Sequence, residues 1–215
     1  MIYPTLQQVQ DWPNLDRYRE ANKKAGLPTP GETRIVLMGD SITEAWSQVD
    51  PDFFSANPYI NRGISGQTTP QMLIRFRPDV VALQPKAAVI LGGTNDIAGN
   101  TGPSSLQMIE DNLMSMAILA KAANISVILS SVLPANDFPW APGMNPAEKI
   151  ATLNDWIKSY SANNDCVFLD YYSSMTDRQG GMLARYSMDG VHPNATGYAV
   201  MAMLAEKAIG SALGK

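Results

Sequence analysis

The sequence predicts an α/β fold in which helices cover both faces of a parallel sheet. Three observations lead to this fold class. Short apolar segments of strand length recur along the chain, stretches with helical periodicity lie between them, and the two kinds of segment alternate throughout. This alternation is typical of doubly wound domains, because each helix returns the chain to the same edge of the sheet.

Five segments are expected to form the sheet. Four of them are continuous apolar runs, the pattern of strands buried on both faces, and the fifth is weaker. The four cover 34–38, 87–91, 126–130 and 167–169, and the weaker one covers 58–61. The single cysteine, Cys166, excludes an internal disulfide and is expected to be a buried residue at the start of a strand.

Three long helices are predicted from apolar residues spaced three and four apart. Pro103 is a helix entry signal for the first, and Asn194 is a candidate N-cap for the third. A shorter helix is expected over 42–46, and another over 15–25 within an N-terminal extension that spans 1–30. The apolar faces are Leu106, Ile109, Leu113, Met116 and Ala120, then Ile150, Leu153, Ile157 and Tyr160, then Tyr198, Met201, Leu204 and Ile209.

Length and charge exclude several classes of protein. A chain of 215 residues suits one domain, 1–215, with the extension packed on it. The formal net charge of −4 argues against a nucleic-acid partner, which calls for a basic face. No apolar segment reaches the ~20 residues of a membrane span. As written the protein is expected to be soluble and cytoplasmic, or periplasmic or secreted if a leader has been removed. Nothing in the sequence indicates its oligomeric state.

The chain contains one histidine, His192, in the run Asp-Gly-Val-His-Pro at 189–193. Imidazole is the side chain best suited to accept and return a proton near neutral pH. Asp189 is placed to hold its ring in one tautomer, and Ser41 in the run Gly-Asp-Ser at 39–41 is the candidate nucleophile. A serine hydroxyl needs such a base, because it attacks a carbonyl only as its proton is removed.

Polar, glycine-containing turns follow the first three expected strands at 39–41, 61–66 and 92–96. The carboxyl ends of parallel strands meet at one edge, so these turns should converge there with His192. They offer three donors for the oxyanion of an acyl-transfer reaction. The predicted donors are the backbone N–H groups of Ser41 and Gly63 and the side-chain amide of Asn95.

Each of these residues also has a purely structural explanation. A serine before a helix is often a cap, a histidine beside proline is often structural, and Asn-Asp after two glycines often forms a turn. The catalytic interpretation is favoured because nucleophile, base, orienting carboxylate and oxyanion donors all occur at predicted strand exits. Ser65 is the weaker candidate nucleophile, because no helix is expected directly after it.

Four sequence blocks resemble those of the SGNH hydrolases, also called GDSL-type esterases. Gly-Asp-Ser-Ile at 39–42 resembles the nucleophile block, with Ile where the family name has Leu, and Gly63 resembles the second-block glycine. Gly-Thr-Asn-Asp at 93–96 resembles the third block, and the run at 189–193 resembles the last, so the four blocks occur in the family's order. The resemblance implies a three-layer α/β/α sandwich with a five-stranded sheet of flavodoxin-like order. It also implies a triad of Ser41, His192 and Asp189, with no metal and no organic cofactor.

The subset of this family that the chain most resembles includes platelet-activating-factor acetylhydrolase-like enzymes and carbohydrate acetylesterases. A loop over 133–146 with four prolines leaves the same edge of the sheet, and loops of this length are often functional. Phe138 and Trp140 are expected either to form a wall of the substrate pocket or to pack the loop onto the body. Arg62 could contact a leaving group or pair with a carboxylate, so it is assigned no role.

The sequence therefore predicts a serine esterase for a small-molecule ester with a short acyl group, acetyl above all, and an acetylated sugar is one candidate. A thioesterase or lysophospholipase would use the same triad. A non-catalytic flavodoxin-like module that binds an anion or a sugar is the alternative from another class, although both glycine-rich phosphate motifs are absent. A zinc site is disfavoured, because one His and one Cys supply too few of the usual ligands.

Overall fold

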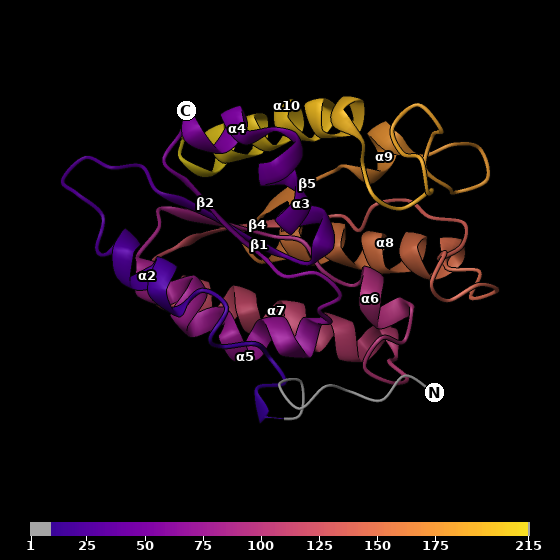
Figure 1. Cartoon of the computed structure of the whole chain (residues 1–215), viewed down its shortest axis with the longest axis horizontal. Coiled ribbons are helices and arrows are strands. Elements are labelled where there is room, and N and C mark those ends of the chain that lie inside the picture. The colour runs from indigo at the N-terminus through magenta and orange to yellow at the C-terminus, as the bar shows by residue number, and fades with distance from the viewer. Residues whose placement is uncertain (1–9, 215) are drawn as a thin grey trace.

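The computed structural model describes residues 10–214 and contains a five-stranded parallel sheet with helices on both faces (Figure 1). The strand order is β2-β1-β3-β4-β5, and every neighbouring pair is parallel. This order is the flavodoxin-like one, so the predicted fold class is confirmed. The strands are β1 (Ile35–Gly39), β2 (Tyr59–Gly63), β3 (Ala87–Ile90), β4 (Ser126–Ser130) and β5 (Val167–Leu169).

The weakest of the five expected strands, β2, lies at an edge of the sheet. It pairs only with β1, in a register that sets Gly63 beside Gly39. An edge strand has less of its surface covered, and its first three residues are only partly buried. That explains why Asn61 interrupts its apolar pattern, whereas Arg62 is buried against the extension, over the Tyr18 ring. Cys166 lies one residue before β5 and is half-buried, not fully buried as expected.

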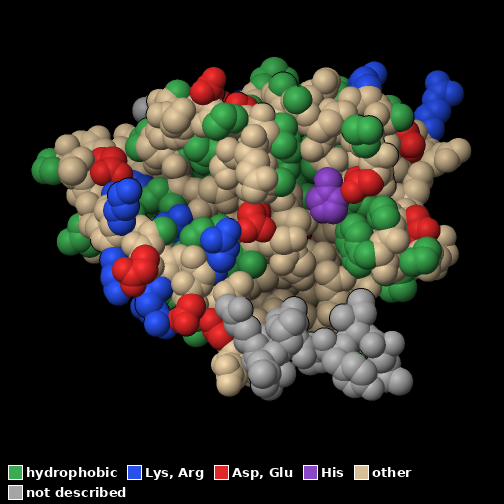
Figure 2. All heavy atoms as spheres, viewed as in Figure 1, with side chains coloured by type: hydrophobic (Ala, Val, Ile, Leu, Met, Phe, Trp, Pro, Cys, Tyr) green, Lys and Arg blue, Asp and Glu red, His purple; other side chains and the backbone are tan. Residues whose placement is uncertain are grey.

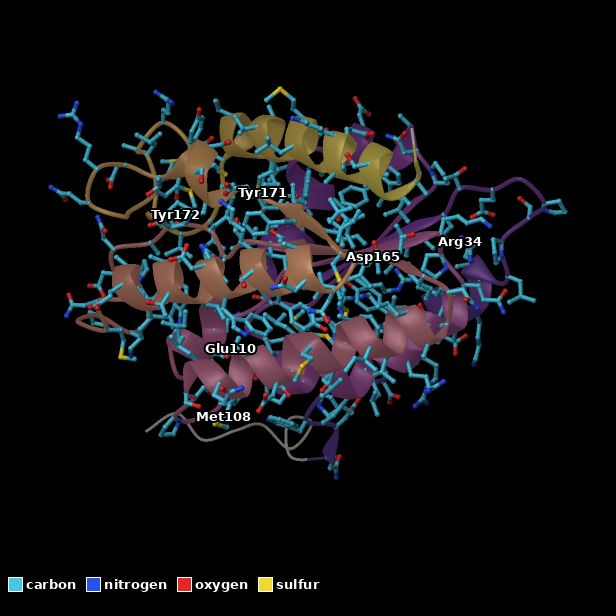
Figure 3. All side chains as sticks on the ribbon, turned by 180° about the vertical axis from the view of Figure 1, so that it is seen from behind. Arg34, Met108, Glu110, Asp165, Tyr171 and Tyr172 are labelled. Atoms are coloured by element: carbon cyan, nitrogen blue, oxygen red, sulfur yellow. The ribbon has the colours of Figure 1, made fainter. Side chains whose placement is uncertain are left out.

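Two helical layers enclose the sheet, as Figure 1 shows. The helices on one face are α5 (Thr69–Asp79), α7 (Leu106–Ala122) and α8 (Ala147–Asn163). The other face carries α3 (Ser41–Val49), α4 (Pro51–Ser55), α9 (Tyr172–Met175) and α10 (Ala195–Ala212). Seen from behind in Figure 3, side chains fill the space between the layers, while the exposed Met108 on α7 points away from it.

The three long predicted helices are present as α7, α8 and α10. The Asn194 side chain accepts the N–H of Gly197 at 3.0 Å and caps α10 as expected. Helix α7 begins after Ser105, whose hydroxyl accepts the N–H of Met108, so the cap lies two residues beyond Pro103. Helix α3 extends over a longer range than the expected 42–46.

Helix α5 was not predicted, because polar side chains break its apolar pattern. Thr69, Gln71, Arg75 and Asp79 are all buried on it beside Met72 and Phe76. The carboxylate of Asp96, which follows β3, accepts both the N–H and the hydroxyl of Thr69 at 3.0 and 2.6 Å. The start of α5 is thus held by a residue from another strand exit and also by a local cap, in which the Gln71 side chain accepts the N–H of Thr68 at 3.0 Å. Apolar periodicity reveals neither contact.

The N-terminal extension follows the prediction in part. Helix α2 (Arg19–Ala25) begins four residues after the expected start at 15, because the Asp11 carboxylate accepts the N–H groups of Leu15 and Asp16 and holds a series of turns. The helix buries none of its own residues. It is attached through Asn22, which donates to the Asp79 carboxylate at 2.7 Å. Residues 1–9 of the extension lie outside the described residues, and the single-domain organisation stays a prediction.

Across residues 10–214, none of the helices combines the length and the apolar character that crossing a bilayer requires.

One buried cation joins the extension, the sheet and the loops. The Arg75 side chain is fully buried and donates to the carbonyl oxygens of Gly39 and Arg62, both at 2.9 Å. It also donates to the side-chain oxygen of Gln67 and pairs with Asp79 at 3.0 Å. Gly39 and Arg62 lie at the ends of β1 and β2, so Arg75 holds these two strand exits together.

Arg75→Met should therefore lower the free energy of unfolding by about 3–5 kcal/mol, because it leaves Asp79 as an uncompensated buried charge. The measurement is urea denaturation followed by circular dichroism. Arg19→Met is the matched control, because the ion pair of Arg19 with Asp16 is exposed and should contribute little. Equal midpoints for the two variants would contradict this account of Arg75.

Candidate active site

Ser41 is the first residue of α3 and is separated from the end of β1 only by Asp40. The turn is tight: the Asp40 carboxylate accepts the N–H of Ile42 at 2.9 Å and caps the helix. A Cβ on Gly39 would lie 2.0 Å from the Thr43 hydroxyl, so only glycine fits at this position. The turn directs the Ser41 hydroxyl toward His192, with 3.0 Å between Oγ and Nε2.

Asp189 holds the histidine from its other side. Its Oδ2 lies 2.7 Å from His192 Nδ1, and its Oδ1 accepts the backbone N–H groups of Val191 and His192 and the hydroxyl of Ser187. Burial acts to raise the pKa of Asp189, but these hydrogen bonds outweigh it and lower the pKa to about 2. An ionised Asp189 requires the proton on Nδ1, which leaves Nε2 free to accept from Ser41.

Asn95 lies in the short helix α6 (Thr94–Ile97), close to the Ser41 turn. Its Nδ2 donates to the carbonyl oxygen of Gln67 at 2.9 Å and, in a longer contact of 3.3 Å, to Asp40 Oδ2. The Ser41 N–H makes no hydrogen bond within residues 10–214. The Ser41 N–H is therefore free among the described residues, and one hydrogen of the Asn95 amide is only weakly held. Donation to an oxyanion, as predicted for these two residues, requires such available hydrogens.

Gly63 differs from the prediction. Its N–H donates to the Asn61 side chain at 2.8 Å, and its carbonyl oxygen accepts from the Tyr18 hydroxyl. A Cβ on Gly63 would lie 2.1 Å from the backbone nitrogen of Glu44, so this glycine permits close packing of α3 on β2. Gly66, in the same turn, has a φ of +76° and an N–H without an acceptor among the described residues. Gly66, the second glycine of the run at 63–66, is thus a candidate donor that the sequence analysis did not consider.

The turn at 63–67 is held from both sides. The Glu44 carboxylate accepts the Ser65 N–H at 2.8 Å and pairs with Arg17 of the extension at 2.9 Å. The Gln67 amide donates to the carbonyl oxygen of Pro13 at 2.7 Å and accepts from Arg75. The Ser65 hydroxyl makes no hydrogen bond to His192, whereas that of Ser41 does.

Phe138 and Trp140 come together, but only one of them reaches the site. Phe138 is fully buried and stacks under Trp140, with 5.2 Å between the ring centroids. Trp140 is 42% exposed, and its ring centroid lies 5.8 Å from that of His192. In Figure 2 the single histidine is visible at the surface between an acidic side chain and an apolar patch. Arg62 points elsewhere: its guanidinium lies over the Tyr18 ring and donates to Asn22.

A hollow of about 320 Å³ adjoins the Asp189 side of the site, between the 133–146 loop and the segment before His192. It is lined by Asn136, Asp137, Pro139, Gly181, Met182, Asp189 and Gly190. Among residues 10–214 no group of three or more His, Cys, Asp or Glu side chains is arranged to hold a metal ion.

The chain matches a protein-family model. The GDSL-like lipase/acylhydrolase family model covers residues 37–200, a range that includes Ser41, Asn95 and His192. A curated relative, the uncharacterized lipoprotein YqeF from Bacillus subtilis, is 30% identical over 127 residues, which are 51% of this chain. The match covers 52% of that relative, so the chain spans about half of its length.

Solved structures of high similarity come from Bacteroides. A candidate acylhydrolase from Bacteroides fragilis is 47% identical with a TM-score of 0.92, and the match covers 94% of this chain and 99% of that one. A GDSL-like lipase from Bacteroides thetaiotaomicron is 45% identical with a TM-score of 0.91 and the same coverage. The acetylxylan esterase Axe2 from Geobacillus stearothermophilus shares the fold at 20% identity, with a TM-score of 0.68 over 84% of this chain and 94% of that one.

The buried carboxyl of Asp40 gives a prediction for stability. Its side chain is 1% exposed, and burial raises its pKa to about 6, although the Ile42 N–H and the nearby His192 act against the rise. The folded state therefore holds this proton more tightly than the unfolded state. The stabilisation is complete below about pH 4 and is lost as the pH rises through about 6.

Between about pH 4 and pH 7 the native protein should lose up to about 3 kcal/mol of unfolding free energy relative to Asp40→Asn. Urea denaturation of both proteins at several pH values measures this difference. A difference that stays constant over the range would show that Asp40 titrates normally.

Proposed function

This chain belongs to the GDSL-like lipase/acylhydrolase family, and we propose that it is a serine esterase for carboxylic esters with short acyl groups, chiefly acetyl. The observation that carries the proposal is the continuous arrangement of hydroxyl, imidazole and carboxylate. Ser41 Oγ lies 3.0 Å from His192 Nε2, and His192 Nδ1 lies 2.7 Å from Asp189 Oδ2. A binding module would have no use for this arrangement, which supports catalysis over the non-catalytic alternative.

In the proposed reaction the Ser41 oxygen attacks the ester carbonyl while His192 Nε2 takes the hydroxyl proton. The tetrahedral intermediate collapses, the bond to the leaving alcohol breaks, and His192 returns its proton to the alcohol oxygen. A water molecule then attacks the acyl-enzyme with His192 as base again, which releases the acid and restores Ser41. Asp189 stays ionised throughout and stabilises the imidazolium.

We assign the oxyanion donors as the N–H groups of Ser41 and Gly66 and the side-chain amide of Asn95, with Gly66 in place of Gly63. The engaged N–H of Gly63 supports this exchange. Asn95 would replace its long contact with Asp40 by a bond to the oxyanion. The first turn of α3 adds the positive end of a helix dipole near the same oxygen.

For the substrate, we propose an acetylated saccharide or a similarly polar leaving group. The exposed face of Trp140 beside His192 suits stacking against the apolar C–H face of a sugar ring. The adjoining hollow offers polar partners for hydroxyl groups in Asn136 and Asp137. The acetylxylan esterase among the structural neighbours is in keeping with this class. The lipoprotein relative supports a location outside the cytoplasm.

Ser41→Ala should abolish labelling by a fluorophosphonate probe and lower kcat for p-nitrophenyl acetate by about 10⁴-fold or more, because the nucleophile is lost. Mass spectrometry locates the label, and a spectrophotometric assay gives the rate. Ser65→Ala is the matched control and should remain active. Equal labelling of native protein and Ser41→Ala would refute the proposal. A parallel panel of thioesters, lysophospholipids and acetylated xylo-oligosaccharides identifies the bond and the leaving group.

Trp140→Ala should raise KM for acetylated oligosaccharides by roughly 10-fold, on the scale of one lost stacking contact. KM for p-nitrophenyl acetate should change much less, because that small ester does not need the wall. Steady-state kinetics on both substrates checks this. Equal KM values for native and variant enzyme on the oligosaccharide would remove Trp140 from the pocket.

A further inference from the structure

We propose that Asn100 is a positioning residue that sets which end of the Asn95 amide faces the reacting carbonyl. This inference rests on the proposed function. Asn100 is exposed and lies in the turn after α6, outside the sequence blocks that suggested the site. Its side chain nevertheless contacts three parts of the site: the aromatic wall, the oxyanion amide and the turn that holds Gly66.

The Trp140 side chain determines the direction of these hydrogen bonds. Trp140 Nε1 donates to Asn100 Oδ1 at 3.0 Å, and an indole N–H can only donate. Asn100 must therefore turn its oxygen toward Trp140 and its NH₂ group toward the site. That group donates to Asn95 Oδ1 at 2.9 Å and to the carbonyl oxygen of Gly66 at 3.3 Å.

The orientation of the Asn100 amide in turn determines that of the Asn95 amide. Because Asn95 Oδ1 accepts from Asn100, its NH₂ group must point the other way, toward the Gln67 carbonyl oxygen and Asp40. A flipped Asn95 would place two NH₂ groups against each other and an oxygen against two acceptors. The contact with Gln67 restrains one hydrogen, and the long contact with Asp40 leaves the other available to the oxyanion. Trp140, Asn100 and Asn95 thus form a relay of amide polarity.

The relay depends on the Asn100 side chain and not on its backbone. The backbone N–H of Asn100 donates to the carbonyl oxygen of Asn95 at 3.0 Å, which holds the turn whatever side chain is present. Since the side chain is exposed, its substitution should leave the fold intact. Loss of the relay should therefore affect stabilisation of the transition state more than binding of the substrate.

The test compares Asn100→Ala with Asn100→Asp on p-nitrophenyl acetate, with circular dichroism to verify folding. Alanine removes the relay, whereas aspartate has the size of asparagine but turns carboxylate oxygens toward Asn95 Oδ1 and the Gly66 carbonyl. We expect kcat to fall about 10-fold for Asn100→Ala and about 100-fold for Asn100→Asp, within the scale of one oxyanion donor. KM should stay within about 3-fold, as expected when only the transition state loses an interaction.

Two further variants separate positioning from a general structural effect. In an Asn95→Ala background, Asn100→Ala should cause no further loss, because a residue that acts through Asn95 has nothing left to orient. Asn163→Ala, an exposed asparagine side chain near the end of α8, should match the native enzyme. Additive losses in the double variant, or a change confined to KM, would overturn the role proposed for Asn100.

The Ser41→Ala enzyme distinguishes failure of this inference from failure of the proposed function. If native protein hydrolyses the ester, Ser41→Ala does not, and both Asn100 variants match native kcat, then only the role of Asn100 is refuted. If native protein and Ser41→Ala are equally inactive or equally active, the esterase assignment fails, and the role of Asn100 fails with it.

Discussion

The buried guanidinium of Arg75 is the interaction on which the arrangement of the site depends. It donates to the last residue of β1, to the penultimate residue of β2 and to Gln67 in the turn beyond. The parallel register brings the two strand exits to the same edge, and Arg75 fixes the distance between them. Asp79 neutralises the cation and in turn anchors the extension through Asn22. One ion pair in the interior thus links the Ser41 turn, the Gly66 turn and the N-terminal segment.

The two halves of the site are built differently. The proposed triad uses charge: Asp189, held by four hydrogen-bond donors, would stabilise the imidazolium that forms when His192 takes a proton. The side proposed to hold the oxyanion uses neutral dipoles whose direction must be set by their neighbours, because an amide group can rotate between two orientations of similar shape. Asn95 therefore needs partners at both ends. This explains why polar side chains crowd around it where an apolar core would otherwise continue.

Much of this organisation was predictable from the sequence. The strands, the three long helices and the Asn194 cap follow from local periodicity and local hydrogen bonding, and they lie within a few residues of their expected positions. Helix α5 was missed because its buried polar residues have partners outside the helix. Arg75 donates to carbonyl oxygens at the ends of β1 and β2, Gln71 donates to Trp12, and Asp79 accepts from Asn22 of the extension. The late start of α2 has a local cause, the Asp11 carboxylate, which outcompetes the helical pattern.

The candidate catalytic groups could be chosen from the residues alone: one histidine, an aspartate three residues before it, and a serine at a strand-to-helix turn. These are properties of residue type and short spacing, and they required no knowledge of distant contacts. Which backbone donors are available depends on contacts between distant segments. Gly63 and Gly66 are alike in sequence, yet the N–H of Gly63 is bonded to Asn61 and that of Gly66 has no partner within residues 10–214. The difference arises because hydrogen bonds form between atoms that folding brings together, and each donor hydrogen serves one strong acceptor at a time.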